Sequence, residues 1–255
     1  MKNYLLSAVK IIILILLVLP ASAQKKSDIP AQNQWITAIV DAKQEEWGDS
    51  LKNFDGDTKF HYSIANDNDN IYLAIAVSDK QRIQNIIAGG ITFFINTEGK
   101  KKEGQSITFP VLSPHKQPQK TNPEQAIRKS VASAKAIKVM GFEKILDGSI
   151  SVNNDFGIKA AAALTDSGQF IYEAAIPLER LNLIAGSGKE LSINIKLNIP
   201  DHPPRVSRMY ESPYETQRRR NRGDYSSPQS RTIISTTAPA GFWIKRTLAT
   251  ASLAK

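Results

Sequence analysis

The sequence predicts an all-β protein, an antiparallel, jelly-roll-like β-sandwich with one or two short helices and a long basic loop. Two observations support this fold class. Short runs of alternating apolar and polar residues recur along the 255-residue chain, and turns rich in Gly, Asn and Asp separate them. The chain also contains no cysteine, which excludes disulfides and thiolate metal sites. The sandwich must therefore be held together by its apolar core.

The first segment is typical of an export signal. Lys2 and Lys10 precede an apolar run at 11–19, and an Ala-Ser-Ala stretch ending at Ala23 follows. Since a bilayer-spanning helix needs about 20 apolar residues, this run predicts cleavage rather than anchoring. We expect a mature chain that begins at Gln24, with no transmembrane segment and no lipid-carrying cysteine. This predicts a periplasmic or secreted protein, which N-terminal sequencing of exported material would check.

Four segments follow from these patterns: a signal peptide at 1–23, a sandwich at 24–199, a mobile loop rich in Arg, Pro and Ser at 200–231, and a closing strand of the same sandwich at 232–255. The formal net charge of +9 is unevenly distributed. Residues 205–231 hold seven arginines against two glutamates and one aspartate, so +4 lies in the predicted loop. The basic balance is therefore local, and export makes nucleic acid an unexpected partner.

The clearest element is a hairpin in "HYSIANDNDNIYLAIAV". Pairing Asn66 with Ile71 places large aliphatic side chains such as Ile64 and Leu73 on one face and small ones on the other. A slip of one residue would mix the two faces, so the register is well specified. The polar residues 67–70 predict the turn, because Asn and Asp bond to their own backbone there.

Further strands are predicted on the same grounds. Residues 91–96 alternate, with Ile91, Phe93 and Ile95 on one face. A second hairpin has its turn at 166–168, and strands follow in "ELSINIKLNI" and in the closing "GFWIKRTLA". Asn122 and Pro123 are a helix cap and a first helical residue, and a short helix is predicted at 178–183.

Several stretches resemble exported β-sandwich proteins related to family 9 carbohydrate-binding modules and the DOMON superfamily. They are "DAKQEEWGD", "FHYSIANDNDNIYLAIAVSD", "GGITFFINTEGKKKEG" and "GFWIKRTLA". The resemblance is strongest over 36–110. It implies a ligand-binding sandwich, with sugars or haem as ligand classes, and does not imply catalysis. Asn96 stands where many relatives place an aspartate, which weakens the expectation of a calcium site at that position.

Two interpretations of the hairpin's small-residue face remain open. It forms a hollow edged by aromatic side chains, which suits a sugar ring, or a second sheet carrying Ala161, Ala163 and Ala175 packs closely onto it. The candidate carbohydrate-binding residues are Trp35, His61, Tyr72 and Phe94.

The polar turn also has two interpretations. Asp55, Asp57, Asp67 and Asp69 could supply oxygens to a structural calcium ion, which takes six to eight of them. The spacing is not that of an EF-hand loop, so a plain turn is the alternative.

The expected function is non-catalytic binding of an oligo- or polysaccharide by an exported protein. One alternative is a structural or interaction protein that uses Arg218, Arg219, Arg220 and Arg222 to bind an anionic envelope surface. Another is a haem-binding electron carrier with a histidine and Met140 or Met209 as ligands.

Overall fold

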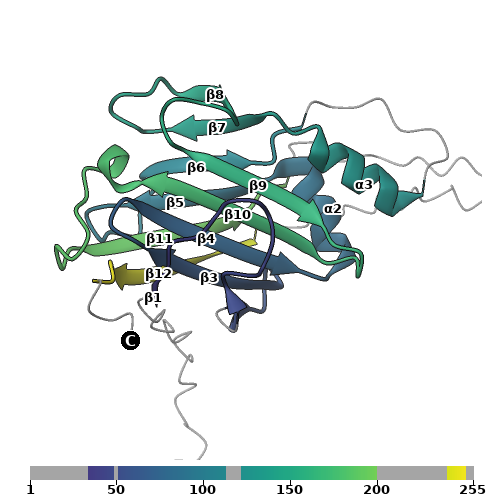
Figure 1. The fold of residues 1–255 in the computed structure, drawn as a ribbon, viewed down its shortest axis with the longest axis horizontal. Helices are drawn as coiled ribbons and strands as arrows, with labels where there is room; N and C mark the ends of the chain where they lie inside the picture. Colours follow the sequence, from purple (N-terminus) through teal and green to yellow (C-terminus); the bar gives the residue numbers. More distant parts are fainter. Residues whose placement is uncertain (1–33, 49–50, 113–121, 200–239, 251–255) are drawn as a thin grey trace, which may run out of the picture.

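Two β-sheets pack face to face in the computed structural model, which describes residues 34–48, 51–112, 122–199 and 240–250 (Figure 1). This is the predicted β-sandwich. Sheet A contains β1 (Gln34–Trp35), β2 (Asn53–Asp55), β3 (Phe60–Asn66), β4 (Asn70–Val77), β9 (Lys159–Leu164) and β10 (Phe170–Pro177). Sheet B contains β5 (Ile91–Asn96), β6 (Gln105–Phe109), β7 (Ala136–Met140), β8 (Gly148–Ser151), β11 (Glu190–Leu197) and β12 (Ala240–Thr247).

Strand order brings together segments that are far apart in the sequence. Sheet A has the order β1-β3-β4-β10-β9, with β2 also paired to β3. Sheet B has the order β12-β11-β5-β6-β7-β8. The pairs are antiparallel except for the short parallel pair of β1 and β3. The last described strand, β12, therefore lies at an edge of sheet B beside β11.

The β3–β4 hairpin has the predicted register. Asn66 pairs with Ile71 and Ile64 pairs with Leu73. The Asp67 carboxylate closes the turn, because its Oδ1 accepts hydrogen bonds from the backbone N–H groups of Asp69 at 2.8 Å and Asn70 at 2.7 Å. The polar residues thus stabilise a turn through their own backbone, as the sequence indicated.

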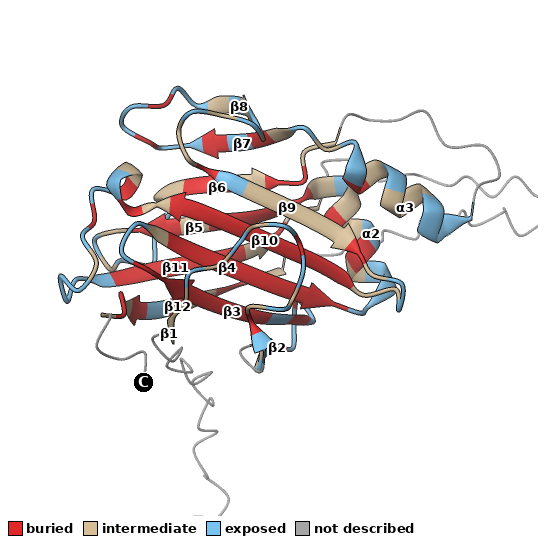
Figure 2. Ribbon diagram, viewed as in Figure 1, coloured by how far each residue is buried: buried red, intermediate tan, exposed pale blue. Residues whose placement is uncertain are grey.

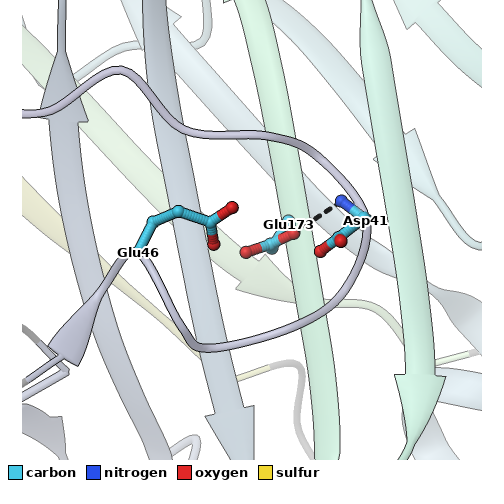
Figure 3. Close-up of side chains that lie close together, drawn as sticks. All are labelled: Asp41, Glu46 and Glu173. Carbon is cyan, nitrogen blue, oxygen red and sulfur yellow. Dashed lines mark hydrogen bonds between the residues drawn. The ribbon is translucent and has the colours of Figure 1, made fainter.

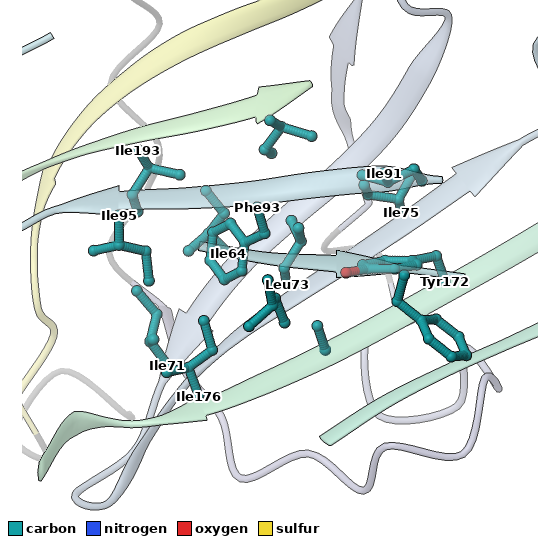
Figure 4. Close-up of a cluster of buried hydrophobic side chains, with 14 of the residues drawn as sticks. Ile64, Ile71, Leu73, Ile75, Ile91, Phe93, Ile95, Tyr172, Ile176 and Ile193 are labelled. Carbon is teal, nitrogen blue, oxygen red and sulfur yellow. The ribbon is translucent and has the colours of Figure 1, made fainter. Parts of the chain in front are cut away.

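The main core lies between the two sheets, where their aliphatic faces meet (Figure 4). Leu73 and Ile75 of sheet A and Phe93, Ile95 and Ile193 of sheet B are all 0% exposed. Each such side chain contributes about 1.5–3 kcal/mol when it is removed from water. The shared face predicted for Ile91, Phe93 and Ile95 is confirmed, since all three belong to this core, and alternate residues of β11 belong to it too.

Three short helices complete the described fold. Helix α3 (Pro123–Ala132) is confirmed where it was predicted, with the Asn122 side chain accepting a hydrogen bond from the N–H of Glu124. The 3-10 helix η2 (Leu178–Leu181) follows β10, also as predicted. Helix α2 (Lys80–Gly89) was not predicted; Asp79 caps it, and it buries Ile83 and Ile86. Within the described ranges, no helix has the length and apolar character needed to cross a bilayer.

Candidate functional site

The outer face of sheet A, which carries the small residues of the hairpin, is covered. The chain between β1 and β2 runs across β3, β4 and β10 (Figure 1). Trp47 is 2% exposed in a cluster with Ala65, Tyr72, Ala74 and Ala175. Figure 2 shows the consequence: these three strands are buried along almost their whole length, and hence on both faces. The predicted hollow is therefore filled by residues 36–48 of the same chain, called the N-terminal segment below.

The alternative interpretation, in which a second sheet packs onto this face, is also wrong. Ala161, Ala163 and Ala175 lie on β9 and β10, which are neighbours of β4 in the same sheet. They extend the small-residue face instead of packing against it. Residues 36–48 can approach the strands closely because the alanine side chains on this face of sheet A are small.

A buried carboxylate fastens this segment to sheet A (Figure 3). Glu173 of β10 is 1% exposed, and its Oε2 accepts hydrogen bonds from the backbone N–H groups of Asp41 at 2.9 Å and Ala42 at 2.7 Å. Its Oε1 accepts from the indole N–H of Trp47 at 2.7 Å. Burial raises the pKa of Glu173, and these donors oppose that shift by stabilising the charged form.

The same carboxylate belongs to a group that could hold a metal ion. Carboxylate oxygens of Asp41, Glu46 and Glu173 lie within 4.8 Å of one another. However, both oxygens of Glu173 already accept N–H bonds, and Asp41 is paired with Lys43 at 2.8 Å, which lowers its pKa. Calcium requires six to eight oxygen ligands. The three hydrogen bonds that Glu173 accepts give this buried carboxylate a structural role, which is to hold residues 41–47 on sheet A.

Asp55 and Asp67, two of the four aspartates predicted as calcium ligands, accept hydrogen bonds from residues in or beside their own turns. Asp67 Oδ2 accepts from the Tyr72 hydroxyl at 2.7 Å, in addition to the turn contacts of Oδ1. Asp55 Oδ2 accepts from the N–H and the hydroxyl of Thr58, both at 2.9 Å. Asp57 and Asp69 are exposed. Two of the four aspartates therefore act as turn-stabilising acceptors, and calcium binding stays a prediction.

The four predicted carbohydrate-binding residues do not form one site. Tyr72 is buried beneath the N-terminal segment, where burial and the hydrogen bond to Asp67 raise its pKa. His61 is exposed on sheet A with its ring 4.8 Å from that of Phe54, and Trp35 is half-buried on β1. Phe94 lies on the outer face of sheet B. The sequence placed Phe94 with the others because alternation shows a residue's face but not its sheet.

The outer face of sheet B carries a row of outward-pointing side chains in which Asn194 and Ser106 are buried, at 8% and 3% exposed, between larger and more exposed neighbours. Trp243, Asn194, Phe94, Ser106 and Met140 are successive register partners across β12, β11, β5, β6 and β7. Their sequence neighbours are buried between the sheets, so these five residues point outward. Phe94 and Trp243 are half-buried and Met140 is 45% exposed. One intervening strand separates the two aromatic residues by about 10 Å.

A second, polar row runs beside the first. Lys196, Thr92, Thr108, Lys138 and Ser149 are register partners across β11, β5, β6, β7 and β8. The hydroxyls of Thr92 and Thr108 are hydrogen-bonded at 2.8 Å, and the Asn198 amide donates to Thr92 at 2.8 Å. These bonds fix the orientation of the two hydroxyl groups; Thr92 is 4% exposed and Thr108 is half-buried.

A hollow of about 370 Å³ lies where the two rows meet the end of α2. This volume is within the range of about 300–1,000 Å³ that small-molecule sites occupy. Its lining includes Thr92, Phe94, Thr108, Lys138, Met140 and Asn198. The hollow combines one aromatic ring, hydroxyls, an amide and an ammonium group. Of these residues the sequence identified Phe94 as a carbohydrate-binding candidate and Met140 as a haem-ligand candidate.

The remaining predicted residues are dispersed or lie outside the described ranges. His61 and Met140, two of the haem-ligand candidates, lie on the outer faces of opposite sheets, so they cannot ligate one iron. His115, His202 and Met209 lie outside the described residues. Arg218, Arg219, Arg220 and Arg222 lie there too, and their binding to an anionic surface stays a prediction.

Comparison with solved structures gives a remote likeness. No protein-family model matches the chain, and a search of curated proteins gives no match. Among solved structures, the chain is similar to a carbohydrate-binding module of family 9 from Caldicellulosiruptor kristjanssonii in complex with glucose. The identity is 11%, the TM-score is 0.31, and the alignment covers 66% of this chain and 77% of that chain. At these values the likeness carries no argument about the site, and the DOMON resemblance stays a prediction.

Proposed function

We propose that this protein is a non-catalytic carbohydrate-binding protein that holds an oligo- or polysaccharide on the outer face of sheet B. The observation that carries the proposal is the row in which Phe94 and Trp243 flank Asn194 on three adjacent strands. Beside it lies the row of oriented hydroxyls around Thr92 and Thr108. The export signal expected from the sequence would place this binding in the periplasm or outside the cell.

The two rows match the two surfaces of a sugar. A pyranose ring has an apolar C–H face, which packs on an aromatic ring, and an edge of hydroxyl groups, which need hydrogen-bond partners. Phe94 and Trp243 supply apolar surface at low cost in side-chain entropy. Thr108 and Asn198 supply side chains that both donate and accept. A largely apolar site with a few placed polar groups is the usual composition of a ligand site.

The charge on this face supports binding without cleavage. Hydrolysis of a glycosidic bond ordinarily requires two carboxyl groups on opposite sides of that bond. The described strands of sheet B point one carboxylate outward, that of Glu190. Lys245 forms an ion pair with it at 2.6 Å. This end of the face therefore offers an ion pair, and the proposed site around Phe94 offers hydroxyl, amide and ammonium groups.

Alanine substitution of the two aromatic residues tests the proposal. After a glycan array identifies a ligand, Phe94→Ala and Trp243→Ala are each expected to weaken its binding about 10-fold or more, as truncation of a central aromatic contact does. Isothermal titration calorimetry measures the change. Both variants should keep the unfolding midpoint within a few degrees, because their rings lie outside the main core.

The matched control is Phe54→Ala. Phe54 is 45% exposed on β2 of sheet A, so this variant removes a similar ring from the other sheet. It is expected to bind the glycan as the wild-type protein does. Equal losses in Phe54→Ala and Phe94→Ala, or no loss in Phe94→Ala and Trp243→Ala, would contradict the proposal.

A further inference from the structure

We infer that the ligand of the sheet B outer face is an anionic polysaccharide, whose negative groups pair with Lys138 and Lys196 while its rings lie on Phe94 and Trp243. This inference rests on the proposed function and adds the charge class of the sugar. It is carried by the positions of the two lysines within the polar row, and by the lack of a carboxylate paired with either of them among the described residues.

The two lysines flank the paired threonines on one line across the sheet. Lys196 pairs in register with Thr92, Thr92 with Thr108, and Thr108 with Lys138. Three strand spacings separate their Cα atoms by about 14 Å. Lys138 is exposed and lines the hollow, and Lys196 is half-buried. Ammonium groups at this spacing suit a ligand with repeating negative charges.

No carboxylate of the described residues neutralises these two lysines. The outward-pointing strand residues of sheet B include three lysines and one glutamate, and the glutamate pairs with the third lysine, Lys245. Lys138 and Lys196 therefore give this face a local charge of +2, next to the hydroxyl groups of Thr92 and Thr108. A positive surface of this kind raises the local concentration of anionic ligands and excludes cationic ones.

The test compares matched acidic and neutral ligands on the full chain. Oligogalacturonate and its fully methyl-esterified form differ in charge and share the same rings. The protein is expected to prefer the acidic form, and Lys138→Gln/Lys196→Gln is expected to lower affinity for it by about 2- to 30-fold. Affinity for the methyl ester should not change. The acid-specific part should also weaken as ionic strength rises.

Two controls separate this face from other positive charge. Lys80→Gln/Lys159→Gln removes the same charge from α2 and from β9 of sheet A, and it should leave both affinities unchanged. Arg218→Gln/Arg219→Gln/Arg220→Gln/Arg222→Gln removes the predicted loop contacts. If either control lowers the acidic affinity as much as Lys138→Gln/Lys196→Gln does, the inference is overturned.

Alginate oligomers and heparin extend the test to a second uronate and to sulfate groups. Lysine-dependent binding of uronates or of heparin supports the inference and identifies the anionic group. Lack of binding to oligogalacturonate, alginate oligomers and heparin overturns it. Equal binding of the acidic and esterified forms, with both lost in Phe94→Ala, also overturns it but leaves the proposed function standing.

Discussion

Trp47→Ala is expected to lower the free energy of unfolding by about 3–5 kcal/mol, the usual range for removing a buried tryptophan. Trp47 is 2% exposed and packs on the alanines of sheet A. Its loss also removes the indole donor at 2.7 Å from Glu173 and leaves a buried carboxylate oxygen unsatisfied. Urea denaturation of the variant and the wild-type protein measures the difference.

Trp47→Phe separates the hydrogen bond from the packing. Phenylalanine keeps most of the apolar surface and lacks the N–H, so a loss of about 1–3 kcal/mol is expected. Trp243→Phe, at a half-buried residue on the outer face of sheet B, is the matched control and should change stability by less than about 0.5 kcal/mol. If Trp47→Ala behaves like Trp243→Phe, residues 36–48 do not pack on sheet A and its outer face is open.

Leu73→Ala is expected to cost about 2–5 kcal/mol of stability. Leu73 is 0% exposed between the two sheets, paired with Ile64 across the hairpin. Its neighbour Ala74 is also buried but points to the opposite face, beneath Trp47. Chemical denaturation should therefore show Ala74→Gly to be less costly, at about 0.5–1 kcal/mol. A neutral Leu73→Ala would show that the faces of the hairpin have been assigned the wrong way round.

The hairpin register and the start of α3 could be predicted because each depends on a pattern of neighbouring residues. Alternation placed Ile64 and Leu73 on one face, and the need to keep that face apolar fixed the register. Asn122 and Pro123 marked the start of α3 through their capping chemistry. In both cases the information lies within a few consecutive residues.

The candidate site could not be predicted because it depends on which distant strands become neighbours. Asn194 lies between Phe94 and Trp243, yet these residues are about 50 to 150 positions apart in the sequence. Their outward orientation is visible in the alternation of each strand, whereas the strand order is not. Residues 36–48 have no strand periodicity, so their position across sheet A could not be predicted from a local pattern.

The proposed function requires that ligand binds on sheet B and not on sheet A. Titration of the isotope-labelled protein with its glycan, followed by backbone amide chemical shifts, tests this directly. The perturbed amides are expected to cluster on β5, β6, β7, β11 and β12, around Phe94 and Asn194. Perturbations centred instead on β3, β4, β10 and residues 36–48 would contradict it.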